Sequence, residues 1–400
     1  MLSVTSACDT NIPAGSWVGS VTDSAGVAIV TSGGPGMWAD STSWTVHTEL
    51  QIGAFGGDPR YQFGQVGSVA LNGQGNILVV DRQAREVREF TSQGEFVQSV
   101  GSPGQGPGEF ARGVTDLFVV GGDTILIPDV RNRRVHRFTP DGRFLDAAPL
   151  DIGEYRVLRS RWSAASSKGV MQVRPATQGV GQAPEDELRV VRADGSLGAV
   201  LLSLPSGGLF EPGGVLRYFT PEPMWGLTDS LTIMYGVTDE YRIGLYDRAG
   251  RLKMLIVREY VPRPITDRDV RAFFAYLDRA WIANGATPER LRENRLRVSF
   301  AETFPTFSAV HEGHLGTIWV QRVQAPGDLT DEQISLYNFI EDFGAPDWDV
   351  FDAKGRFLGV VRMPPRFQPR LFVGDAIYGV QRDELDVQYV ARLKVNNPMR

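Results

Sequence analysis

The chain has 400 residues, of which 42% are hydrophobic and 22% are charged, a composition that suits a globular protein with a large core. A formal net charge of −6 and a pI near 5.4 argue against a nucleic-acid-binding protein, which ordinarily carries a basic surface. No apolar run approaches the ~18–20 residues of a membrane span, and 45 glycines with 24 prolines indicate many short strands joined by tight turns.

The first 25 residues are predicted to form an N-terminal tail around the single cysteine, Cys8, which excludes an internal disulfide. The sequence from Val4 to Cys8 resembles the end of a bacterial lipoprotein signal. The apolar segment that normally precedes such a cysteine is missing, however, and Thr5 stands where an aliphatic residue is usual. Two interpretations stay open: a lipid anchor on Cys8, or a polar tail with one exposed thiol.

A repeat of about 48 residues indicates the fold. Three pairs of equivalent residues are each 48 positions apart: Asp81 and Asp129, Phe90 and Phe138, and Gly94 and Gly142. Four short apolar runs separated by turn residues recur in each unit, which is typical of a β-propeller blade.

Six such units are predicted between residues 66 and 393, and the sixth is one strand short. A matching strand lies at the other end of the chain, at residues 44–52. A ring of sheets avoids an exposed edge if its first strand completes the last blade. We therefore expect an all-β, six-bladed β-propeller over residues 26–400, with the N-terminal strand closing the last blade and a small helical insertion at residues 262–305.

Residues 101–110 and 129–135 resemble the glycine-rich loop and the Asp-x-x-Asn-x-Arg-Val turn of NHL-repeat and related bacterial six-bladed propeller proteins. The resemblance is sharp over residues 53–146 and only architectural beyond them. The family includes binding modules, scaffolds and a few enzymes, so the resemblance implies a fold without implying one function.

The long insertions are all predicted on one face of the propeller, at residues 174–187, 261–305 and 323–347. Thr266 is a candidate helix cap, and an apolar stripe follows it, which is expected either to pack on the propeller or to dock a partner. The stripe includes Phe273, Phe274 and Trp281.

Charged residues divide across the same face. Arginines gather in the turns of blades one and two, and acidic residues gather in the insertions of blades three and five, which suits the orientation of a charged partner. The alternative is solvated loop charge with local ion pairs. The arginines are Arg82, Arg85, Arg131, Arg133 and Arg134, and the acids are Glu185, Asp186, Glu187, Asp328, Asp331, Glu332, Glu341 and Asp342.

No catalytic or metal-binding constellation is evident in the sequence. The four histidines, at positions 47, 136, 311 and 314, are scattered, whereas catalytic zinc needs about three convergent ligands. The glycine-rich residues 101–108 precede a strand, whereas a phosphate loop precedes a helix.

We therefore expect a non-enzymatic binding or scaffolding protein without cofactor or metal. Its partner would be another protein, such as a subunit of a membrane complex, on the periplasmic or extracytoplasmic side. Membrane contact would come only through that partner or through a lipid on Cys8. The alternative is a calcium-dependent lactonase or esterase, with Asp116 and loop acids at the channel mouth.

Overall fold

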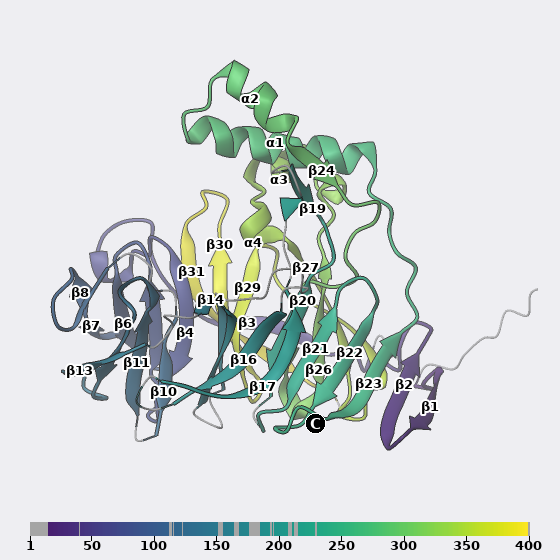
Figure 1. The fold of residues 1–400 in the computed structure, drawn as a ribbon, viewed down its shortest axis with the longest axis horizontal. Coiled ribbons are helices and arrows are strands. Elements are labelled where there is room, and N and C mark those ends of the chain that lie inside the picture. Colours follow the sequence, from purple (N-terminus) through teal and green to yellow (C-terminus); the bar gives the residue numbers. More distant parts are fainter. Residues whose placement is uncertain are drawn as a thin grey trace, which may run out of the picture.

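A computed structural model describes residues 15–39, 41–111, 114, 116–121, 123–150, 155–163, 168–175, 185–192, 194, 196–206, 210–211, 215–228 and 230–398. Six antiparallel sheets form the blades of a propeller, and helices with a small extra sheet stand on one of its ends (Figure 1). The predicted six-bladed β-propeller is confirmed.

The first three blades follow one another along the chain, each with four strands in sequential order. Blade one contains β4 (Val66–Leu71), β5 (Ile77–Asp81), β6 (Glu86–Phe90) and β7 (Phe96–Val100). Blade two contains β10 (Phe118–Val120), β11 (Thr124–Asp129), β12 (Arg134–Phe138) and β13 (Phe144–Pro149). Blade three contains β14 (Tyr155–Ser163), β15 (Lys168–Pro175), β16 (Glu185–Val191) and β17 (Leu197–Pro205). The short strands β8 (Ser102–Pro103) and β9 (Glu109–Phe110) lie between blades one and two.

The last three blades keep the same order of strands. Blade four contains β20 (Pro223–Leu227), β21 (Ile233–Val237), β22 (Arg242–Tyr246) and β23 (Leu252–Arg258). Blade five contains β25 (Ala309–Glu312), β26 (Ile318–Val323), β27 (Gly344–Phe351) and β28 (Phe357–Arg362). Blade six contains β29 (Phe367–Val373), β30 (Ala376–Arg382), β31 (Gln388–Asn396) and β3 (Thr45–Ile52).

The repeated aspartates fix the turn between the second and third strands of the first two blades. Asp81 is fully buried, and its carboxylate accepts hydrogen bonds from the backbone N–H groups of Gln83 and Ala84 at 3.0 and 3.1 Å. Asp129 is equally buried and accepts a hydrogen bond from the backbone N–H of Asn132 at 3.3 Å. In such a tight turn several backbone N–H groups have no backbone acceptor. The buried carboxylate accepts their hydrogen bonds and so stabilises the turn.

The predicted closing strand is confirmed. β3 pairs antiparallel with β31 from Thr45 opposite Asn396 to Ile52 opposite Val390. Two strands far apart in the sequence thus share one blade, which closes the ring and covers the outer edge of β31.

The N-terminal segment extends further around the ring than predicted. β1 (Gly19–Ser24) and β2 (Val27–Ser32) form a hairpin, and β2 pairs parallel with β23 at the outer edge of blade four (Figure 1). Trp38 then donates a backbone hydrogen bond to the carbonyl of Leu358, on the outer strand of blade five, at 2.8 Å. Part of the segment predicted to be a tail is therefore the strand β1, because it pairs with β2, which is itself held by β23 of blade four.

The insertions build a cap on the end of the propeller that bears the inter-blade connections (Figure 1). It contains α1 (Asp267–Ala283), α2 (Pro288–Arg295), α3 (Asp331–Leu336) and α4 (Phe339–Asp342), with a sheet of β18 (Phe210–Glu211), β19 (Val215–Tyr218) and β24 (Val298–Phe300). Thr266 and Asp269 form a reciprocal capping box at the start of α1. None of the described helices has the length and hydrophobicity to cross a membrane.

Candidate functional site

A cleft of about 690 Å³ opens between the cap and the upper ends of blades four, five and six. Its walls come from the end of β23, from β26 to β28, and from the chain that enters blade six. The insertion within blade five, which carries α3 and α4, covers it on the side of the cap. A concave site of this size, assembled from several blades and a covering segment, is the usual form of a binding site.

Many charged residues line the cleft, but their positive and negative charges nearly cancel. Its charged lining groups are five arginines and six acids: Arg258, Arg263, Arg322, Arg362 and Arg366, with Glu259, Asp328, Glu341, Asp342, Asp347 and Asp349. Most of them form ion pairs: Arg263 donates to Asp328 at 2.8 Å, and Arg362 donates to Asp347 at 3.3 Å. Groups of both signs, most of them in ion pairs, therefore line the cleft.

Asp349, a residue of β27 that is only 5% exposed, organises one wall of the cleft through its hydrogen bonds. The hydroxyl of Tyr241 donates to Asp349 Oδ2 at 2.7 Å, and Nε and Nη2 of Arg322 donate to Oδ1 at 2.9 and 2.7 Å. Burial, followed by the charge of Asp349, raises the pKa of Tyr241 well above its ordinary value. Tyr241 is therefore a neutral donor, and the group positions the Arg322 guanidinium on the cleft wall.

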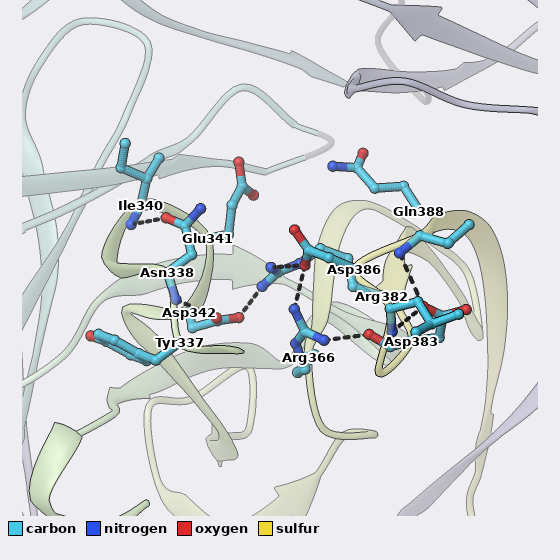
Figure 2. Close-up of polar contacts among 12 residues, drawn as sticks. Tyr337, Asn338, Ile340, Glu341, Asp342, Arg366, Arg382, Asp383, Asp386 and Gln388 are labelled. Atoms are coloured by element: carbon cyan, nitrogen blue, oxygen red, sulfur yellow. Dashed lines mark hydrogen bonds and ion pairs between the residues drawn. The ribbon is translucent and has the colours of Figure 1, made fainter. Parts of the chain in front are cut away.

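The opposite end of the cleft is a network that connects α4 to blade six (Figure 2). Arg382 on β30 is 3% exposed; it forms an ion pair with Asp342 of α4 and donates to Asp386 at 2.8 Å. Arg366 also donates to Asp386. Burial raises the pKa of Asp342 above its ordinary value, against the opposing effect of Arg382. The cap segment is thus attached to the propeller by buried charges.

Next to this network, Arg370 lies at a bulge in β29. Pro369 pairs with Gly379 and Leu371 with Tyr378, so Arg370 is an extra residue on its strand. Its Nη2 lies 3.8 Å from Glu341 Oε2 of α4. Burial, and to a smaller extent the charges of Arg82 and Arg382, lower the pKa of Arg370.

The five predicted arginines all lie in or next to the second-to-third turns of blades one and two. Arg82, Arg131 and Arg133 are exposed, whereas Arg85 and Arg134 are partly buried. Arg134 donates to the buried Asp129 at 3.3 Å and to the Glu109 carbonyl at 3.1 Å, so its guanidinium is engaged within blade two. None of the five is among the residues that line the cleft.

The predicted apolar stripe of α1 packs inside the cap. Phe273 is fully buried, with its ring 4.7 Å from that of Tyr218 and 5.0 Å from that of Phe219, so it cannot contact a partner. Phe274 and Trp281 are partly buried against the same cluster. Cys8 lies outside the described residues.

Sequence reasoning missed the arginines that line the cleft and Arg382, which pairs with one of its acids. Arg263 and Asp328 are 65 positions apart, and Arg382 and Asp342 are 40 positions apart. The sequence signal that could have located the cleft was the cluster of acidic residues in the blade-five insertion. These residues were predicted to face the arginines of blades one and two. Asp328 and Asp342 pair instead with arginines that the prediction had not considered.

Within the described ranges, no group of three or more histidine, cysteine or acidic side chains is arranged to hold a metal ion. Arginines pair with most of the cleft acids, as described above. What the cleft offers is therefore an array of fixed hydrogen-bond donors and acceptors.

A family model described as "6-bladed beta-propeller" (DUF5128) matches residues 59–161, which comprise blades one and two and the start of blade three. No match to a curated protein sequence reaches significance. The predicted likeness to NHL-repeat proteins in particular stays a prediction.

Solved structures with the same architecture are distant in sequence. A Bacteroides fragilis protein described as exported is 11% identical, with coverage of 92% of this chain and 99% of that one and a TM-score of 0.50. A DUF4221 family member from Bacteroides vulgatus is 10% identical, with 90% and 100% coverage and a TM-score of 0.50. A Xanthomonas campestris gluconolactonase is 11% identical, with 88% and 99% coverage and a TM-score of 0.42. At these identities the likeness concerns the fold alone.

Proposed function

We propose that this chain is a non-enzymatic binding propeller that recognises a segment of another protein in the cleft beneath its cap. The observation that carries the proposal is the composition of the cleft: five arginines against six acids, most of them already paired and held in place. A polypeptide presents alternating donors, acceptors and charges of both signs, and it matches such a surface better than a polyanion does.

Recognition also fits the state of the ionisable groups. A general acid or base needs a group that is free to exchange a proton with a substrate. The acids at the two ends of the cleft are instead bound to arginines, as in Asp349 with Arg322 and Asp342 with Arg382. Groups engaged in this way orient a partner and discriminate against a wrong one.

The exposed arginines of blades one and two provide a second contact on the same face. Arg131 and Arg133 are exposed in the second-to-third turn of blade two, Arg82 is exposed in that of blade one, and none of the three lines the cleft. Exposed rim charges mainly accelerate association and make it sensitive to salt. We assign them a steering role for a partner that carries acidic residues outside its bound segment.

We further propose an extracytoplasmic location, with Cys8 as a lipid attachment site. The sequence before Cys8 resembles the end of a lipoprotein signal, and a Bacteroides fragilis protein of the same architecture is described as exported. A partner in a membrane complex would then be reached from the membrane surface.

The proposal is tested by photocrosslinking in cells. A benzophenone amino acid is placed at Gln333 or Arg362, which both line the cleft, and at Lys253, an exposed residue of β23 outside it. The same crosslinked protein should appear from both cleft positions and not from Lys253. Crosslinks that are equally strong from Lys253, or absent from both cleft positions, would refute the cleft as the binding site.

A further inference from the structure

A second, smaller cavity lies on the other side of α4 from the charged cleft. Its volume is about 250 Å³, and it opens where the innermost strand of blade four, β20, begins. Six of its lining residues are apolar: Phe219, Met224, Pro305, Phe339, Ile340 and Phe343. Glu222 is the one ionisable residue that lines it. Its character is therefore opposite to that of the cleft.

α4 separates the two cavities and presents a different face to each. Asp342 points toward Arg382 and joins the buried ionic network, whereas Ile340 points away from that network (Figure 2). The Ile340 side chain is 78% exposed. An aliphatic side chain so exposed, on a helix fixed by buried charges and beside aromatic residues, forms an accessible apolar surface.

The back of the cavity is rigid. Phe219 is 2% exposed, and its backbone adopts a left-handed conformation with φ of 60°, which is strained for a residue with a side chain. Its ring packs 4.8 Å from Phe304 and 5.7 Å from Phe339. Packing within the cap core therefore holds this strained residue at the back of the cavity.

The size and position of the cavity indicate what would fill it. Pockets for small-molecule ligands usually measure roughly 300–1,000 Å³, and this one is smaller. Pro305 lines both this cavity and the charged cleft, and α4 is shared by both. The two cavities are therefore neighbours, as two subsites for one bound chain would be.

We propose that this cavity is an anchor subsite for one large apolar side chain, leucine or phenylalanine, of the bound protein segment. The identity of the segment rests on the function proposed above, whereas occupation of the cavity by an apolar side chain can be measured without it. A buried apolar anchor beside a polar surface is the usual distribution of binding energy in protein recognition.

The subsite is tested by methyl NMR on the whole protein with labelled isoleucine and methionine. The probes are N-acetyl-L-leucine amide and N-acetyl-L-phenylalanine amide, and N-acetyl-L-serine amide is the polar control. Both apolar amides should shift the Met224 and Ile340 methyl signals in a saturating manner. The methyl of Ile282, which is 57% exposed on α1, should not follow.

Two matched variants complete the test. Ile340→Ser should weaken the saturation seen at Met224 severalfold, and Ile282→Ser should leave it unchanged. Shifts that do not saturate, that are equal at Ile282, or that the serine amide reproduces would overturn the subsite. If the amides saturate while the cleft crosslinks fail, the subsite stands and the proposed function falls; if crosslinks form without saturation, the subsite falls alone.

Discussion

Replacing Arg382 by methionine tests whether buried charge holds the cap to the propeller. Arg382 is 3% exposed, and its partner Asp342 has a side chain that is 13% exposed. Removal of one member of a buried ion pair costs about 3–5 kcal/mol, because the other charge is left without compensation. We expect a loss of stability at the lower end of this range, because the backbone N–H of Asn338 still donates a hydrogen bond to Asp342 at 2.9 Å.

The corresponding change in melting temperature is small but measurable. An unfolding entropy of roughly 2.1 cal/mol/K per residue gives roughly 0.8 kcal/mol/K for a chain of this length. A loss of about 3 kcal/mol therefore lowers Tm by about 4 °C. Arg362→Met is the matched control: its ion pair with Asp347 involves an arginine side chain that is 69% exposed, and exposed pairs contribute about 0–1 kcal/mol.

The effect of Arg382→Met should also depend on pH. The folded pKa of Asp342 lies above its ordinary value, so the stability linked to this group is present at low pH and lost as pH rises through the folded pKa. Without Arg382 that pKa rises further, because the nearest cation is gone. The deficit of the variant should therefore be largest near neutral pH and should shrink in mild acid.

Urea unfolding of the wild type and both variants, near neutral pH and in mild acid, measures these differences directly. A deficit for Arg382→Met no larger than that of Arg362→Met would contradict the reasoning. So would a deficit that stays constant between the two pH values, because Asp342 would then not be the group left uncompensated.

Three further predictions concern other parts of the molecule. Burial alone would raise the pKa of Asp129, but its hydrogen bonds lower that pKa to about 2, against the ordinary value of 3.8. The lowered pKa stabilises the folded protein by about 2 kcal/mol at pH values above the ordinary pKa. This stabilisation is lost as the pH falls through the folded-state pKa. Urea unfolding of Asp129→Asn should show that loss near neutral pH and little of it near pH ~2. Deletion of residues 45–52 should expose the edge of blade six and cause aggregation in light scattering, and a soluble variant with an unchanged melting curve would refute closure. Purified protein with calcium should not hydrolyse lactones or aryl esters, and turnover that a chelator and Asp116→Ala both abolish would favour the hydrolase alternative.

The propeller could be predicted because its signals are local. The apolar runs of a blade, the buried aspartate at its turn and the glycines of its hairpins all lie within about 48 residues of sequence. The closing strand at residues 44–52 was found by the same logic, since a blade with three strands requires a fourth. The capping box of α1 needed only Thr266 and Asp269, three positions apart.

The N-terminal hairpin and the cleft depend on distant pairings that the sequence does not display. Every residue of β1 is exposed, so β1 lacks the alternation that marks a half-buried strand. The apolar run of β2 was the available signal, but its partner, β23, lies more than 200 residues away. The cleft pairs join separate insertions, and neither member of a pair indicates the other before the blades bring them together.

The course of the N-terminal segment around blades four, five and six has a consequence for biosynthesis. β3 ends at Ile52, whereas its partner β31 begins only at Gln388, so the two strands are synthesised far apart in time. At synthesis rates of about 5–20 residues per second, roughly 20–70 s separate the two. β2 likewise waits for β23. During that interval both strands lack their native neighbours, so the nascent chain depends on its surroundings to prevent premature pairing. The ring can close only after β31 has been synthesised.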